Sequence, residues 1–176
     1  MATFGQTGNN AGSTTSSADS ALMNKAADAE STPASNGTLD SVVARVWVSG
    51  TGSTVGKGII YSEAGDLIAT GDETAINSNV EVAVTFPFSG AQRIALTAGT
   101  KYNYGIIYND PGADDLTWSR QATASASWKY SDNYEDGPAA TIGTGTVSGP
   151  IDIYVNYTED SVATLKNNSA FGNILA

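Results

Sequence analysis

The stretch VVARVWVS, residues 42–49, alternates between apolar and mixed side chains. Every second residue from Val42 to Val48 is apolar, so these side chains would share one face of a strand. Arg45 and Trp47 would lie on the opposite face. A period of two is the pattern of a strand with one buried face. The stretch therefore predicts one strand of a sheet that covers a core.

The same pattern recurs along the chain. The segment at residues 80–88 alternates cleanly, and its Pro87 predicts that this strand lies at a sheet edge or ends there. Its expected inward side chains are Val80, Val82, Val84, Phe86 and Phe88. The other expected strand segments are residues 57–62, 66–70, 93–96, 101–109, 116–131 and 150–158. About eight short strands separated by turn residues predict an all-β fold, an antiparallel β-sandwich or jelly roll.

The chain divides into three parts by composition. Residues 1–40 are rich in Gly, Asn, Ser and Thr and predict a polar N-terminal arm, within which residues 20–30 form either a short helix or an extended segment. Residues 41–158 would form the sandwich, which should stay folded without the arm, and residues 159–176 a short C-terminal tail. Apolar residues in the two end segments would anchor the protein on a neighbouring subunit. These predicted anchors are Phe4, Leu22, Met23, Phe171, Ile174 and Leu175.

Composition excludes several functions. The 176 residues include no Cys and no His, which removes disulfides, ordinary zinc sites and His-dependent catalysis. The net charge of −10 argues against nucleic-acid and anionic membrane partners. Residues 1–13 lack the basic and apolar regions of a secretory signal peptide, and no apolar run approaches the ~20 residues of a membrane helix.

Two acidic loops are candidate calcium sites, because Ca²⁺ prefers six to eight oxygen ligands. The candidate ligands are Asp110, Asp114, Asp132 and Asp136. Aspartate is also a good turn residue, so a purely structural role is the alternative. We predict no resident cofactor, with calcium as the open alternative. Paired loop carboxylates could also cleave a glycoside, but nothing in their spacing indicates it, and we predict that the protein is not an enzyme.

Aromatic residues gather in the later part of the chain. If exposed, they would stack on sugar rings, whereas a packing role in strands is the alternative. The candidate glycan-binding residues are Trp118, Trp128, Tyr130 and Tyr134.

Several short motifs occur in an order that resembles a jelly-roll-like module of bacteriophage head and tail proteins. The matching motifs are TFGQTG (3–8), RVWVSGTGS (45–53), GIIYSEAGDLIAT (58–70), TFPFSG (85–90), LTAGTKYNYGIIY (96–108), YSDNYEDGP (130–138) and IDIYVNYT (151–158). The resemblance covers nearly the whole chain, and the module has no catalytic residues to transfer.

The resemblance implies a structural or adhesive protein of a virion, made in the host cytoplasm. A small chain with polar end segments fits a capsid decoration protein that binds the major capsid protein or another virion protein, as a homo-oligomer with a trimer favoured. The alternatives are a tail-associated component, a carbohydrate-binding adhesion module and a subunit of an extracellular filament that exchanges strands.

Overall fold

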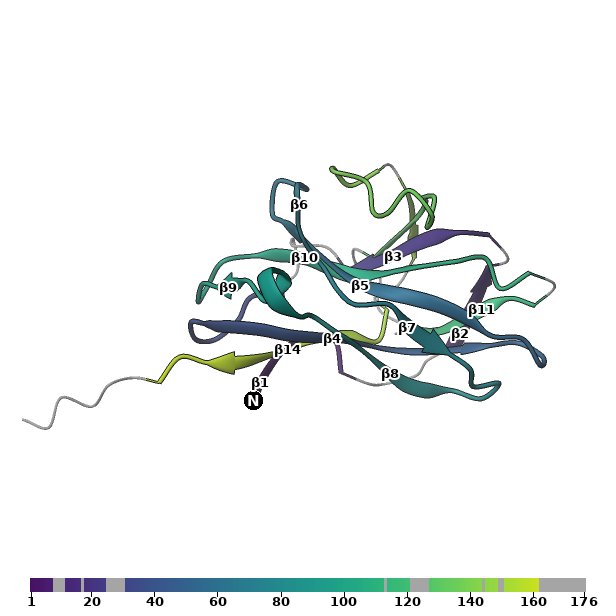
Figure 1. The fold of residues 1–176 in the computed structure, drawn as a ribbon, viewed down its shortest axis with the longest axis horizontal. Coiled ribbons are helices and arrows are strands. Elements are labelled where there is room, and N and C mark those ends of the chain that lie inside the picture. The colour runs from purple at the N-terminus through teal and green to yellow at the C-terminus, as the bar shows by residue number, and fades with distance from the viewer. Residues whose placement is uncertain are drawn as a thin grey trace, which may run out of the picture.

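The computed structural model describes residues 1–7, 12–16, 18–24, 31–112, 114–120, 127–143, 145–148 and 151–161. They form two antiparallel sheets that pack face to face around a hydrophobic core, as Figure 1 shows. The predicted all-β antiparallel sandwich is confirmed. The described residues contain fourteen strands rather than about eight.

Sheet A is organised around one long central strand, β4, which pairs with β14 and β11 along one side and with β8 and β9 along the other. Beyond β14 lies β1, and beyond β11 lies β2. The strands of sheet A are β1 (Ala2–Gly5), β2 (Gly12–Ser16), β4 (Gly37–Val48), β8 (Val82–Pro87), β9 (Ala95–Leu96), β11 (Leu116–Arg120) and β14 (Ile153–Glu159).

Sheet B has the strand order β13-β12-β3-β10-β5-β6, and β7 also pairs with β5. A short 3-10 helix, Gly90–Gln92, precedes β9. The strands of sheet B are β3 (Ser20–Asn24), β5 (Thr54–Ser62), β6 (Leu67–Thr70), β7 (Thr74–Ile76), β10 (Tyr102–Tyr108), β12 (Ser127–Ser131) and β13 (Thr146–Ser148).

Alternating sequence and buried face agree in the long strands. Every second residue of β4 from Val42 to Val48 faces the core, as the sequence predicts. The same holds for β14, where Ile153, Val155 and Tyr157 are buried, and for β10, where Tyr102, Tyr104, Ile106 and Tyr108 are. These side chains fill the space between the sheets, and their removal from water stabilises the fold.

The N-terminal segment departs most from expectation. The described part of residues 1–40 is not an arm outside the sandwich: it contributes β1 and β2 to sheet A and β3 to sheet B, and β4 already begins at Gly37. Removing residues 1–40 would therefore take three strands, with the buried side chains of Phe4, Leu22 and Met23, out of the two sheets. Ser20–Asn24 is a strand rather than the start of a helix, because both of its neighbours in sheet B supply backbone partners. Residues 25–30 lie outside the described residues.

β3 is inserted between β10 and β12 and is buried along its whole length. Leu22 packs into the core between the sheets, and Met23 packs on the opposite face of sheet B. At the end of the strand the Asn24 amide bonds twice to Ile151: its Nδ2 donates to the Ile151 carbonyl (2.8 Å), and its Oδ1 accepts from the Ile151 N–H (3.0 Å). β3 is thus fixed both to its own sheet and to the segment that enters β14.

A glycine allows β3 and β10 to lie this close. Gly105 on β10 stands opposite Met23, and a Cβ at this position would overlap the carbonyl oxygen of Leu22. A side chain here would push the two backbones apart, so the pairing in this register requires glycine.

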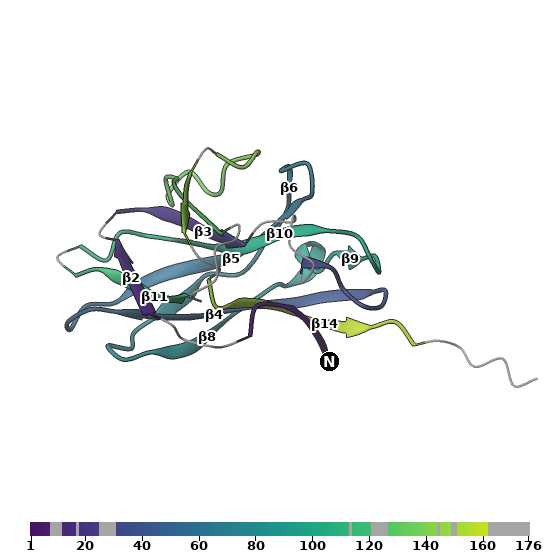
Figure 2. The same ribbon diagram turned by 180° about the vertical axis from the view of Figure 1, so that it is seen from behind.

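The outer face of sheet B is covered by the loop of residues 132–143, which Figure 2 shows above β3 and beside β6. The Tyr61 hydroxyl donates to the Ala139 carbonyl (2.9 Å), and the Leu67 N–H donates to the Ala140 carbonyl (2.9 Å). Tyr134 from this loop packs beside Met23 in a second, smaller apolar cluster. The loop therefore buries a face of sheet B that would otherwise meet solvent.

The N-terminal strand is held by an aromatic cluster. The Phe4 ring lies 5.6 Å from the Tyr104 ring in an edge-to-face arrangement and 6.0 Å from the Tyr157 ring. Gly5 follows with φ +112°, and a Cβ there would contact the Tyr104 hydroxyl at 2.9 Å. Phe4 is thus the buried side chain that β1 contributes to the core, and at the next residue, Gly5, the backbone adopts a conformation that favours glycine.

We predict that Phe4→Ala lowers the free energy of unfolding by about 3 kcal/mol, because it leaves a cavity in the aromatic cluster. Thr3→Ala, on the exposed face of the same strand, is the matched control and should stay within about 0.5 kcal/mol of the wild type. Urea unfolding followed by tryptophan fluorescence measures both. Equal effects of the two substitutions would mean that β1 does not pack into the core.

Candidate interaction surfaces

The predicted N-terminal anchors are buried inside their own fold. Phe4, Leu22 and Met23 are 6%, 0% and 1% exposed. Their apolar side chains are already used by the sandwich, so in this form they do not reach a neighbouring subunit, contrary to the prediction. The predicted anchors of the tail, Phe171, Ile174 and Leu175, lie outside the described residues.

The candidate glycan-binding aromatics do not form a common exposed platform in the described structure. Trp118 is 1% exposed and faces the core from β11, and Tyr134 is 5% exposed. Both are therefore unavailable for stacking on a sugar, and their prediction as sugar-stacking residues is wrong. Trp128 and Tyr130 lie on β12, and their side chains fall outside what the structure describes.

Tyr134 has a structural role. Its hydroxyl donates to Glu73 Oε2 (2.9 Å), and the Lys57 ammonium lies 4.8 Å from the centre of its ring. Burial raises the pKa of Tyr134 well above its usual range, and the hydrogen bond to Glu73 raises it further. These contacts hold the loop of residues 132–143 on sheet B.

Each predicted calcium ligand accepts a hydrogen bond from a nearby N–H group. Asp114 Oδ2 accepts from the Gly52 N–H (2.6 Å), and Asp110 Oδ1 accepts from the Gly112 N–H (2.7 Å). In the second loop, Asp132 Oδ2 accepts from the Ala139 N–H (3.0 Å), and Asp136 Oδ2 accepts from the Asn133 amide (2.8 Å). Within the described ranges, no three acidic side chains lie close enough together to hold a metal ion. Calcium binding by these loops stays a prediction.

Asp19 joins the two acidic loops and was not singled out by the sequence. One of its oxygens accepts from the Asp110 N–H, and the other accepts from the Tyr134 N–H (3.4 Å). Beside it lies an open hollow of about 410 Å³. The hollow is lined by Ala18, Asp19, Ser131, Asp132 and Asn133. Asp19 lies outside any alternating pattern. Its hydrogen bonds form where three segments that are distant in sequence meet in the fold, so the sequence contains no signal for its role.

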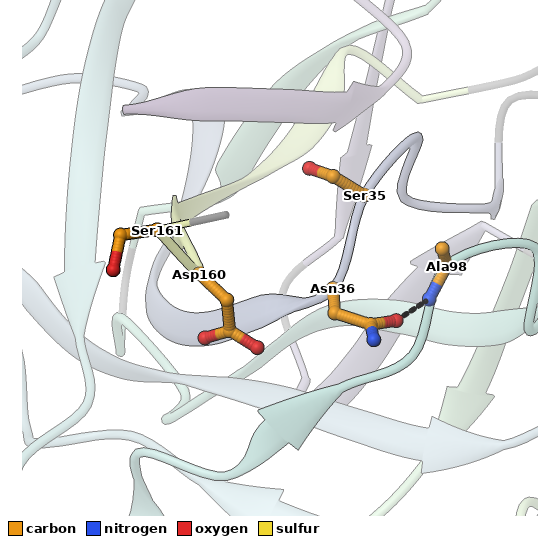
Figure 3. Close-up of a pocket in the computed structure, with 5 residues that line it drawn as sticks. All are labelled: Ser35, Asn36, Ala98, Asp160 and Ser161. Carbon is orange, nitrogen blue, oxygen red and sulfur yellow. Dashed lines mark hydrogen bonds between the residues drawn. The ribbon is translucent and has the colours of Figure 1, made fainter. Parts of the chain in front are cut away.

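A second hollow, of about 260 Å³, lies where β14 ends (Figure 3). It is lined by Ser35, Asn36, Ala98, Asp160 and Ser161. Asn36 holds it together: its Oδ1 accepts from the Ala98 N–H (2.8 Å), and its carbonyl accepts from the Asp160 N–H (2.9 Å).

The edge strand β8 carries exposed apolar side chains. In the described residues its pairing partner is β4, and it ends at Pro87, as the proline predicts. Phe86 and Phe88 are buried as expected, but Val82 is 38% exposed and Val80 is 65% exposed. Val80 and Val82 were predicted to point into the core, but they are not buried. The neighbouring strand of sheet B, β7, has only three residues and does not cover them.

The chain segment that contains β8 carries few charges for an acidic protein. Between Glu73 and Arg93 the single charged residue is Glu81. Its Oε1 lies 3.2 Å from Arg45 Nη1, while Arg45 Nε lies 2.9 Å from Asp152 Oδ2. Arg45 thus neutralises the edge strand and links it through β4 to the entry of β14.

No protein-family model matches the chain, and no curated protein is significantly similar to it in sequence. Within the part of the chain that the structure describes, no helix is long and apolar enough to cross a bilayer.

We predict that Asp19→Ala lowers the free energy of unfolding by about 1 kcal/mol, because two backbone N–H groups lose a charged acceptor at a partly exposed site. Asp136→Ala, which removes one exposed side-chain bond, is the matched control and should cost less. Thermal unfolding of both variants measures the difference. If Asp19→Ala were no more harmful than the control, the two loops would not depend on Asp19.

Burial also raises the pKa of Tyr108 above its usual value of 10.0. Below pH 10 the phenol stays protonated in folded and unfolded chains, and its contribution to stability is fully present. Above pH 10 the unfolded chain ionises first, so stability falls as pH rises. We expect Tyr108→Phe to reduce this alkaline loss of stability, measured by urea unfolding between pH 8 and roughly pH 11. An unchanged slope would contradict the assignment.

Proposed function

We propose that this protein is a non-enzymatic structural protein of a virion: a capsid decoration protein that binds the capsid surface in many copies. It would act by adding contact area between capsid subunits, so that binding stabilises the assembled shell by mass action. Its partner would be the major capsid protein or another virion protein. A homo-oligomer, with a trimer as the first to test, is part of the same proposal.

The observation that carries the proposal is where the phage-like motifs fall in the fold. The first motif, at residues 3–8, includes most of β1, and the last, at residues 151–158, includes most of β14; the two strands pair, with Phe4 opposite Val155. The motifs between them contribute to β4, β5, β6, β8 and β10. The resemblance therefore follows the frame of the whole sandwich rather than isolated turns.

The edge strand β8 is the contact surface that we assign to this function. Val80, just before the strand, and Val82, at its start, offer exposed apolar area, and the acidic residue between them, Glu81, is paired with Arg45. A partner can cover the valine end of this edge without approaching an unpaired charge, whereas Asp72 lies at the opposite end, where its N–H donates to the Pro87 carbonyl (2.7 Å). Edge strands with free backbone groups are ready templates for pairing with another chain.

Copy number in purified particles tests the proposal. Quantitative mass spectrometry on particles from the source culture should find the protein in hundreds of copies, on the order expected for an interface repeated over a symmetric shell. The copy number should track that of the major capsid protein. A handful of copies would place the protein in a tail, and absence from particles would overturn a virion function.

We further predict that Val80→Asp weakens binding of the purified protein to particles that lack it by about tenfold or more, because a charge would be buried at the interface. Thr85→Asp is the matched control, since it adds the same charge at an exposed position within β8, five residues further along the chain. Co-sedimentation with particles measures both. Equal binding of Val80→Asp and wild type would remove β8 as the contact surface without removing the protein from the virion.

A further inference from the structure

We propose that residues 1–24 are an exchangeable element, in which β1, β2 and β3 of one copy fill the corresponding places in a second copy of this chain. The partner is a second copy because the places that these strands occupy are built by the remainder of the same sequence. The exchange would link copies without a new interface chemistry, since each contact made within one chain would be made between two.

The pairing pattern sets this segment apart. β1 pairs with β14, β2 with β11, and β3 with β10 and β12. In the described residues, these three strands pair neither with one another nor with any strand from β4 to β9. The strand partners of this segment all lie from Tyr102 onward. Along the chain, however, the next described strand is β4, with which the segment does not pair.

The place of β3 must be filled for sheet B to exist as a continuous sheet. Without β3, β10 and β12 would each lose backbone pairing along five residues. The cavities that hold Leu22 and Met23 would also be empty, although both side chains are now fully buried. Unpaired buried backbone groups and large cavities are costly, so a chain whose own segment is displaced will take the same segment from a neighbour.

The contacts that fix the segment are independent of which chain supplies it. Asn24 makes its two bonds with Ile151, and Phe4 packs against Tyr104 and Tyr157. All of these partners lie in the second half of the chain. Closed monomer and exchanged dimer thus bury the same surfaces, and their balance depends on protein concentration and on the connection between the two parts.

The connection limits the geometry of the exchanged form. Residues 25–30 join Asn24 to Ser31. Seven residue steps span at most about 25 Å when fully extended. In a reciprocal dimer the end of β3 in one copy must therefore lie within about 25 Å of Ser31 of its own chain, which brings the two sandwiches into direct contact.

Engineered disulfides in the full chain test the proposal directly, because the natural sequence contains no cysteine. Thr3 on β1 faces Asn156 on β14, and both side chains are at least partly exposed. The double variant Thr3→Cys with Asn156→Cys would be prepared with and without ¹⁵N label, unfolded, mixed, refolded and oxidised. We expect disulfides that join one labelled and one unlabelled chain, identified by mass spectrometry.

A matched control uses two strands outside the exchanged element. Thr38 on β4 faces Thr158 on β14, so the variant Thr38→Cys with Thr158→Cys should give disulfides within single chains only. For the β1–β14 pair, the ratio of linked dimer to linked monomer should rise about tenfold for a tenfold rise in free monomer concentration during refolding. Disulfides within single chains alone, at every concentration, would overturn the proposal, and so would equal interchain linkage of the control pair.

The wild-type chain provides a second measurement if the cysteine variants fail to fold. After refolding at high concentration, light scattering coupled to size exclusion should detect a dimer that persists for hours after dilution. Separation is slow because the β3 strand of each chain must leave sheet B of the other chain. A protein that is monomeric throughout, or a dimer that dissociates at once on dilution, would overturn the exchange. These experiments use purified protein without particles, so their outcome is independent of the copy number that tests the proposed function.

Discussion

The structure depends on the insertion of β3 between β10 and β12. Five consecutive residues with fully buried side chains complete sheet B, supply Leu22 to the core between the sheets, and tie sheet B to the entry of β14 through Asn24. The glycine at position 105 makes this approach possible. Because β3 comes from the early part of the chain and its neighbours from the later part, the sandwich is closed by segments that are distant in sequence, and each sheet contains strands from both parts.

Alternation in the sequence predicted the strands that have one face in the core and one face outward. In β14 the burial follows the pattern residue by residue, and in β4 every second residue from Val42 to Val48 faces the core. β3 could not be found in this way. Its side chains are buried on both faces, with Leu22 between the sheets and Met23 under the loop of residues 132–143, so no polar residue marks an outer face. Without β-branched residues either, the segment SALMN carries no strand signal of its own.

The candidate sites were less predictable than the fold. Trp118 lies between small polar residues that fit either face of a strand, and only the pairing of β11 with β4 and β2 decides that it points inward. The loop aspartates have the composition of a metal site, but their carboxylates accept hydrogen bonds from nearby turns. The exposed end of β8 follows from the shortness of β7 across the sandwich, which is a property of two distant strands and is not visible in the sequence of either.

The remoteness of the partners of β1 has a consequence for synthesis on the ribosome. β1 pairs with residues up to Tyr157, so it must wait until nearly the whole chain has been made. At about 5–20 residues per second, that wait is on the order of ten seconds. A chain that stops early lacks β14 and leaves Phe4 without its aromatic neighbour Tyr157. Incomplete products therefore cannot complete sheet A. Only chains that have been translated through β14 can fold fully, and shorter products stay accessible to proteases.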